Sequence, residues 1–277
     1  MNVSTSSSPR ALEPAFHERV WGVENLGPWF PMAVPPPGGK LGEAWFTADP
    51  PLPILVKFLF AAESLSVQVH PEGECGVGKT EMWRILRAGP GARIALGFDQ
   101  PIASPELREA ALSGEIERLL RWIPVSAGET YFIPAGTIHA IGAGVTICEI
   151  QQNSDITYRL YDYGRPRELH LDPGLAAADL ENWRHPGACA AIELADGWKR
   201  LAGCRYFATD SIDLGGPFLY QPGPGRFELL ICIEGAGQLS GRPLSQGDVW
   251  LIPEGIGLLP IGCAGALSLL RAYVPQD

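Results

Sequence analysis

Two histidines, a glutamine and a glutamate have the types and spacing of a divalent-metal site. In the segment 66–71, Ser-Val-Gln-Val-His-Pro, Gln68 and His70 lie two residues apart. Side chains alternate between the two faces of a strand, so these two project from the same side. Glu81 follows a glycine-rich turn on a returning strand, and His139 comes from a third segment. One amide oxygen, two imidazoles and one carboxylate can bind a divalent metal and leave a coordination position open for a substrate.

The composition indicates a globular β protein and limits its partners. The 277 residues are 46% hydrophobic and 19% charged, with 33 glycines and 26 prolines. Frequent glycine and proline between β-branched and aromatic runs favour many short strands and turns. A formal charge of −10 argues against a nucleic-acid-binding surface, although a few local cations suffice for one anionic ligand.

The sequence also predicts a cytoplasmic protein. Residues 1–9 are rich in serine and threonine and lack the apolar stretch of a secretory signal. No apolar run approaches 18 residues, so we expect no membrane span. The cysteines are widely spaced and form no Cys-x-x-Cys pair, which is typical of reduced thiols.

Short β-strands must position the candidate ligands. Apolar or alternating stretches predict strands over 42–46, 54–60, 65–70, 81–87, 130–134, 145–151 and 157–162, and a short helix around 172–183. The run 54–60 is apolar except for Lys57, which fits a strand buried on both faces. Trp21 and Trp45 could wall a ligand pocket, but core packing is the role that we predict for them.

Residues 104–122 interrupt the β pattern with a predicted pair of short helices. Ser104 suits the N-cap position and Pro105 the first helical position. Gly114 can end the first helix. The segment that follows, up to Trp122, repeats an amphipathic pattern with apolar residues at helical spacing.

An internal repeat divides the chain into two β modules. Residues 128–139 align with 247–258: each has glycine and an acid, an apolar strand, Ile-Pro, one residue and then glycine. Before them, residues 81–89 resemble 228–235. Because one supersecondary unit occurs twice, we predict two copies of one architecture.

The predicted metal site occurs in only one module. The second module has Leu258 where the first has His139, and no histidine follows His185. We therefore predict a flexible tail over 1–13, a catalytic module over 14–186 with a helical insert at about 104–122, and a metal-free module over 187–277.

The repeated motif resembles the second motif of the cupin family. Its pattern over 128–139 is Gly-acid-x₄-Pro-x-Gly-x₂-His, and in cupins this histidine points into the barrel. The resemblance implies a mainly β fold of two cupin-like (jelly-roll) β-barrel modules, with the helical insert in the first. The usual first cupin motif begins His-x-His. Gln68 at its first position is unusual for an iron-dependent cupin oxygenase.

Several ungapped motifs, in family order, resemble the type I mannose-6-phosphate isomerases, which are zinc-dependent cupins. The matching segments are 21–22, 42–45, 55–59, 65–71, 78–83, 134–144 and 149–165. This resemblance implies a zinc-dependent aldose–ketose isomerase that interconverts mannose 6-phosphate and fructose 6-phosphate through a metal-stabilised enediolate. It implies one zinc per chain and a small-molecule sugar phosphate as the partner.

The resemblance also implies a ligand set and an oxyanion group. His70, Glu81 and His139 match the family's zinc ligands. Gln68 matches a fourth ligand, or it orients a water or His70. Arg159 matches an active-site arginine that stabilises the enediolate oxyanion, and the alternative is a salt bridge with a nearby aspartate, Asp155 or Asp162.

Four further residues are candidates for the reaction. Lys79 shares the face of Glu81 and either holds the phosphate or moves the proton. Lys57 has the same two roles open to it, or it is a structural lysine. Ser66 resembles a phosphate contact. Glu149 is a proton-handling carboxylate or a partner of a ligand. The sequence leaves the base open, and a hydride shift as well.

Two other functions fit the same fold. A non-catalytic or weakly active sugar-phosphate-binding cupin is supported by the short loop between His70 and Glu81, and opposed by the intact metal set. An iron-dependent oxygenase is opposed by Gln68 and by the motif around Arg159.

Overall fold

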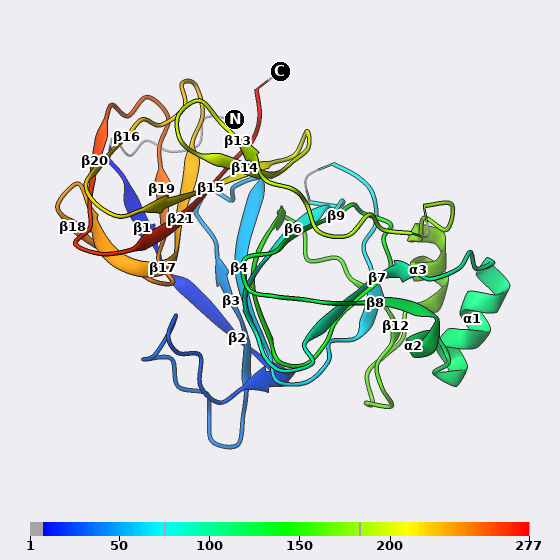
Figure 1. Ribbon diagram of the computed structural model, residues 1–277. Helices are drawn as coiled ribbons and strands as arrows, with labels where there is room; N and C mark the ends of the chain where they lie inside the picture. Colours follow the sequence, from blue (N-terminus) through cyan, green and yellow to red (C-terminus); the bar gives the residue numbers. More distant parts are fainter. Residues whose placement is uncertain (1–7, 75, 183, 277) are drawn as a thin grey trace.

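The computed structural model describes residues 8–74, 76–182 and 184–276 and shows two β modules side by side (Figure 1). The first module contains two antiparallel sheets. The six-stranded sheet runs in the order β2 (Pro14–Val23), β3 (Leu41–Phe46), β4 (Ile54–Ala61), β11 (Val145–Gln152), β6 (Glu81–Ala88) and β9 (Thr130–Ile133). The five-stranded sheet runs β12 (Tyr158–Tyr161), β5 (Val67–Val69), β10 (His139–Ile141), β7 (Arg93–Phe98) and β8 (Leu120–Pro124).

The second module forms one sheet of ten strands. Its main path is β1 (Arg10–Leu12), β19 (Val249–Ile252), β17 (Glu228–Leu239), β21 (Leu267–Tyr273), β15 (Ala208–Leu214), β14 (Lys199–Gly203) and β13 (Ile192–Glu193). Off this path lie β16 (Phe218–Tyr220), β18 (Arg242–Ser245) and β20 (Leu259–Gly262). The predicted mainly β fold is confirmed.

The predicted tail over 1–13 is wrong for its last part. Residues 10–12 form β1, which pairs antiparallel with β19 through Ala11 and Trp250. Figure 1 shows β1 in blue among the strands of the second module. Residues 1–7 lie outside the described residues. The first segment of the chain therefore completes the sheet of the last module.

The internal repeat is confirmed by strand pairing. In the first module β6 pairs with β9, and Glu81 lies opposite Ile133. In the second module β17 pairs with β19, and Glu228 lies opposite Ile252. The two carboxylates thus occupy equivalent positions in the two sheets.

Three helices cover one side of the first module in the described part of the chain. They are α1 (Ser104–Ser113), α2 (Ile116–Leu119) and α3 (Leu171–Ala177) (Figure 1). The helix pair is confirmed, and Gly114 ends α1 with a left-handed φ of 83°. Ala103, not Ser104, is the N-cap, and residues 120–122 belong to β8, because they pair with β7. No helix among the described residues is long and apolar enough to span a membrane.

The core lies in three places that matter for the site. Between the two sheets of the first module, buried apolar side chains include Trp21, Leu59, Trp83, Leu96 and Tyr131. A second cluster joins the modules, with Phe46, Phe58 and Phe60 packed near Leu229 and Leu251. A third holds α1 against β5 and β12. The strands that carry the candidate ligands are therefore packed on both faces.

Candidate active site and metal centre

Three predicted ligands meet in the first module. The ligand atoms of His70, Glu81 and His139 all lie within 4.8 Å of one another, and all three residues are buried. His70 follows β5, Glu81 begins β6 and His139 begins β10. Residue 139 lies directly opposite Gln68 in the β5–β10 pair, so strand register brings the two motifs together.

The histidines are oriented to present one nitrogen each to the centre. Nδ1 of His70 donates to the carbonyl of Ile156 at 2.9 Å, and Nδ1 of His139 donates to that of Thr137 at 2.8 Å. This leaves Nε2 as the free lone pair in both rings. Burial lowers the pKa of His139 to about 4 and that of His70 well below its usual value, and Lys79 adds to both shifts. Both rings are therefore neutral at pH 7, the form that binds metals.

Glu81 supplies a carboxylate oxygen that needs a partner. Its Oε1 is buried without a hydrogen-bond partner among the described residues and lies 3.5 Å from Nε2 of His139. Burial raises the pKa of Glu81 to about 8, with Glu149 adding and Lys79 opposing the shift. An unsatisfied buried oxygen is costly, and a cation beside two imidazoles removes that cost. The residues present thus fit a divalent metal.

Gln68 lies beside the three ligands. Its Nε2 is 3.2 Å from Nε2 of His139 and its Oε1 is 3.5 Å from the hydroxyl of Ser66. In this orientation the amide donates to the lone pair that a metal would use. Turning the amide by 180° would present its oxygen to the centre instead. Both roles predicted for Gln68, metal ligand and partner of a ligand, are compatible with this position.

Lys79 lies at the metal cluster. Its ammonium is 2.5 Å from Oε2 of Glu81, 2.9 Å from Nε2 of His70 and 3.9 Å from Oε1 of Glu149. The side chain is buried, and the two carboxylates hold the pKa of Lys79 above its usual value against the effect of burial. Lys79 is therefore a buried ammonium beside the metal cluster, and both roles predicted for it stay open.

A row of inward-facing side chains crosses the six-stranded sheet next to this cluster. Trp45, Lys57, Glu149 and Trp83 are successive register partners on β3, β4, β11 and β6. Trp83 donates from Nε1 to Glu149 at 3.0 Å, and Lys57 lies 3.6 Å from Glu149. Burial alone would raise the pKa of Glu149, but Lys79 and Lys57 keep it below its usual value. Glu149 is therefore a buried carboxylate that stays ionised.

Arg159 on β12 does not form the ion pair that was its alternative role. Asp162 instead binds Arg167 through two bonds of 2.6 Å each. Arg159 donates from NH1 to the carbonyl of Glu168 at 2.8 Å, and its Nε is buried without a partner among the described residues. Among the described residues the guanidinium is thus held by one hydrogen bond and forms no ion pair.

One cavity of 450 Å³ brings most of the candidate residues together. It is lined by six of them: Lys57, Ser66, Gln68, Lys79, Glu149 and Arg159. Trp45 also lines it and carries the Lys57 ammonium 4.1 Å from its ring centroid, so the prediction of a core role is wrong for Trp45. Trp21 is buried in the core and borders the cavity as well.

The sequence reasoning missed several residues of this cavity: Arg19, Glu43, Asp155, Thr157 and Arg167. On β3, Glu43 and Trp45 lie two residues apart, and this period of two was the available signal. On β2 the consecutive residues 18–21 all line the cavity, where the pairing with β3 is irregular, so no period of two in the sequence marks Arg19.

The described residues between 71 and 78 of the short loop pack away from this cavity. The backbone N–H of Thr80 donates to Gln152 at 2.8 Å, and Gln152 donates to the carbonyl of Gly73 at 3.1 Å. Ser154 donates to the carbonyl of Val77 at 3.1 Å. None of the described residues between 71 and 78 lines the 450 Å³ cavity. The loop therefore anchors the segment that follows β11.

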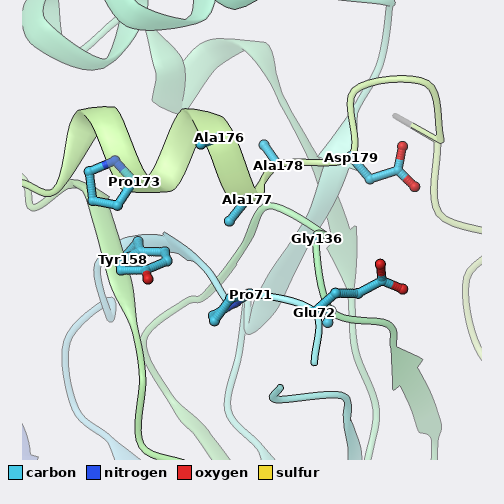
Figure 2. A pocket seen from close by; sticks show the side chains of 10 residues that line it. Pro71, Glu72, Gly136, Tyr158, Pro173, Ala176, Ala177, Ala178 and Asp179 are labelled. Carbon is cyan, nitrogen blue, oxygen red and sulfur yellow. The ribbon is translucent and has the colours of Figure 1, made fainter. Parts of the chain in front are cut away.

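A second cavity, of 590 Å³, lies between the loop after His70 and helix α3 (Figure 2). It is lined by Pro71, Glu72, Gly136, Tyr158 and residues of α3. His70, Glu81 and His139 line neither cavity, but Gln68 and Lys79, which contact them, line only the 450 Å³ one. Its charged side chains are the carboxylates of Glu72 and Asp179. Two carboxylates disfavour an anionic ligand, so this cavity does not compete for a sugar phosphate.

The second module has a different arrangement at the equivalent carboxylate. Glu228 is buried and accepts hydrogen bonds from the hydroxyl of Tyr220, from Nε of Arg226 at 2.9 Å and from the N–H of Gly223 at 3.1 Å. Protein groups thus satisfy the oxygens that correspond to those of Glu81.

Comparison with known proteins decides the family. No family model matches the chain. Over 305 residues it is 32% identical to the mannose-6-phosphate isomerase ManA of Bacillus subtilis, covering 91% of this chain and 95% of that protein. The chain belongs to the mannose-6-phosphate isomerase family. A relative from Streptococcus mutans, also named mannose-6-phosphate isomerase, is 33% identical over 215 residues, or 61% of this chain and 67% of that protein.

The fold of the family matches over nearly the whole chain. The crystal structure of the mannose 6-phosphate isomerase from Bacillus subtilis superposes with a TM-score of 0.85 at 29% identity, covering 96% of this chain and all of that one. A putative mannosephosphate isomerase from Archaeoglobus fulgidus matches with a TM-score of 0.79 at 19% identity, covering 98% and 99%. The resemblance seen in the motifs and the cupin-like fold are both confirmed.

Proposed function

We propose that this protein is a metal-dependent isomerase that interconverts mannose 6-phosphate and fructose 6-phosphate. The observation that carries the proposal is the buried cluster of His70, Glu81 and His139 beside a cavity lined by lysines and arginines. It occurs in a chain with 32% identity to a mannose-6-phosphate isomerase over 91% of its length.

The metal we propose is zinc, one per chain. Two imidazoles and a carboxylate are ligands that zinc accepts, with Gln68 as the fourth, and they leave a position for substrate. A mannose 6-phosphate isomerase bound with zinc and yttrium has the same fold, with a TM-score of 0.75 at 17% identity. When bound, the metal supplies a Lewis acid for the substrate oxygens.

The proton transfer is assigned to Lys79 and Glu149. Aldose–ketose isomerisation moves a hydrogen between C2 and C1, so a base must stand beside these carbons. Lys79 contacts two of the metal-site residues, and Glu149, kept ionised, lies 3.9 Å from it. Because Lys79 already holds its proton and Glu149 stays ionised, Glu149 can receive the proton from the substrate carbon, Lys79 can return its own proton to the neighbouring carbon, and Glu149 can then restore the proton of Lys79.

Arg159 is assigned to the charge that develops on the substrate oxygen. Its guanidinium lines the cavity and forms no ion pair among the described residues, so it can donate to a ligand without first breaking a salt bridge. A preorganised donor stabilises a developing oxyanion more than solvent does, because it needs no reorganisation. Ser66 and Lys57 line the same cavity and are assigned to substrate binding.

We also propose that the module boundary lies near residue 186, with modules over 14–186 and 187–277. His185 Nε2 donates to the carbonyl of Phe132 at 2.5 Å, which ties this segment to the first module. The first strand of the second module after this point, β13, begins at Ile192. A cytoplasmic location stays a prediction from the sequence.

The test is a coupled assay of mannose 6-phosphate turnover by the purified chain before and after chelator treatment. We expect turnover that the chelator abolishes and zinc restores. A fully metallated protein without turnover would contradict the isomerase and leave a sugar-phosphate-binding protein. Metal analysis after purification in limiting zinc and iron separates the isomerase from an iron-dependent oxygenase.

A further inference from the structure

We propose that Arg19, fixed by Glu43, binds the phosphate group of the substrate from the β2–β3 wall of the cavity. The inference deepens the proposed function and rests on it, since it concerns the sugar phosphate of that site. Arg19 lies on β2 with 31% of its side chain exposed, and Glu43 lies on β3 with 12% exposed. Both line the 450 Å³ cavity.

Arg19 is held in one orientation. Its NH2 donates to Oε2 of Glu43 at 2.6 Å, and its NH1 donates to the carbonyl of Glu18 at 2.9 Å. Trp45 donates from Nε1 to the same Glu43 oxygen at 2.8 Å. These bonds use two of the five donors of the guanidinium, which leaves donors for a ligand. A cation that is already fixed loses less conformational entropy when an anion binds.

The backbone beneath Arg19 is adapted to it. A Cβ added at Gly42 would lie 2.5 Å from the Cβ of Arg19, so the arginine stem lies directly over the strand at this glycine. Only a residue without a side chain permits this approach. The close packing of β2 on β3 thus sets where the guanidinium enters the cavity.

A continuous chain of contacts connects Arg19 with the metal cluster. It runs along the inner wall through Glu81, Lys79, Glu149, Lys57, Trp45, Glu43 and Arg19, with successive separations of 2.5, 3.9, 3.6, 4.1, 2.8 and 2.6 Å. The first carbons of the sugar belong at the metal end. The phosphate on the sixth carbon must therefore lie toward another part of the cavity.

The lysines along this wall are engaged elsewhere. Lys79 pairs with Glu81, and Lys57 pairs with Glu149, all of them buried. On the opposite wall Arg167 uses its Nε and NH2 in two bonds to Asp162. A phosphate carries about −1.5 to −2 charges at pH 7, and arginine binds it with two parallel hydrogen bonds. Arg19 is also paired, with Glu43, but unlike the buried lysines its side chain is 31% exposed, and three of its five donors remain. Arg19 is therefore a cation of the β2–β3 wall that can bind the phosphate.

The experiment measures binding of mannitol 6-phosphate to the zinc-loaded protein by calorimetry. This ligand has no carbonyl group and cannot be isomerised, so binding is separated from turnover. Arg19→Met is expected to weaken binding about 10- to 100-fold at pH 7.5, because a charged hydrogen-bond pair is lost. Arg19→Lys should recover part of the loss. Lys40→Met, which removes a cation paired with Glu63 outside the cavity, is the control and should bind as the wild type does.

A second readout separates phosphate binding from a structural role. The phosphate ester loses its second proton near pH 6, so wild-type affinity should rise between pH 5.5 and pH 7.5. Arg19→Met should flatten that rise, which a general weakening of the fold would leave intact. Glu43→Gln keeps the cation and should therefore retain the rise with pH.

The outcomes separate this inference from the proposed function. If Arg19→Met binds mannitol 6-phosphate as tightly as the wild type, or keeps the full rise with pH, the inference is wrong even in an active isomerase. If the wild-type protein shows the Arg19-dependent binding but no turnover of mannose 6-phosphate, the inference stands and the isomerase is wrong.

Discussion

Replacing Glu149 by glutamine removes the charge that compensates two buried lysines. The carboxylate lies 3.6 Å from the Lys57 ammonium and 3.9 Å from that of Lys79, and all three side chains are buried. Lys79 retains Glu81 at 2.5 Å, and without Glu149, which raises the pKa of Glu81, that carboxyl ionises more readily. Lys57 loses its nearest carboxylate. Breaking one side of a buried pair costs about 3–5 kcal/mol. Because these contacts are longer than hydrogen bonds, we expect Glu149→Gln to lower the free energy of unfolding by about 3 kcal/mol at pH 7.

The difference in unfolding free energy between the wild type and Glu149→Gln should become smaller as the pH rises. Burial lowers the pKa of Lys57 and Glu149 opposes that shift, so glutamine at 149 lowers it further. Between that lowered pKa and the unfolded value of about 10.4, the unfolded chain binds more protons than the folded one. The free energy of unfolding then rises with pH, by at most about 1.4 kcal/mol per unit for one proton. Urea denaturation of the metal-free proteins at pH 7 and pH 9 measures the change.

The double variant Lys57→Met with Glu149→Gln is the control. Removing both charges should cost less than the sum of the two single losses, by about 1–3 kcal/mol, because no uncompensated lysine remains at position 57. Equal deficits of Glu149→Gln at pH 7 and pH 9, together with additive losses in the double variant, would refute the reasoning.

Three further outcomes are expected. Because the pKa of Glu81 is raised to about 8, zinc binding should release close to one proton from it at pH 7 but only about 0.1 at pH 9. Calorimetry in buffers of different ionisation enthalpy measures the number of protons released. Equal release at pH 7 and pH 9 would count against Glu81 as a ligand. Arg159→Met should lower kcat about 100-fold with a smaller change in KM, and steady-state kinetics showing the reverse pattern would assign Arg159 to ground-state binding. Gly114→Ala should destabilise the protein by about 1 kcal/mol or more, because φ is +83° and the added Cβ meets the hydroxyl of Tyr161 at 3.0 Å. Gly128→Ala, at φ +91° with open space around it, is the matched control, and an equal loss of stability in denaturation would remove the clash with Tyr161 from the account.

The metal cluster could be predicted because its signals are local. Gln68 and His70 share a strand face by a period of two, and the repeat aligned Glu81 with Glu228 before any pairing was known. The observed register, with Gln68 opposite His139, is what the motifs required. The strand around Arg159 was predicted from its local pattern, whereas its place at the site was implied by the resemblance to the isomerase family.

The other parts depend on contacts between distant segments. Arg19 and Glu43 meet only because β2 pairs with β3 through an irregular register. Asp162 pairs with Arg167 and not with Arg159, because of the geometry of the side chains. The spacing of these residues in the sequence does not predict which pair forms. Residues 10–12 pair with β19, more than 200 residues away, which a short apolar segment alone cannot indicate.

The most direct test of the central claim is a zinc titration of the chelator-treated protein, with mannose 6-phosphate turnover measured at each step. The cluster of His70, Glu81 and His139 predicts that activity rises in proportion to zinc and reaches its plateau at one equivalent per chain, and that His139→Ala gives no such plateau. Full turnover by protein without metal, or an unchanged titration of His139→Ala, would contradict it.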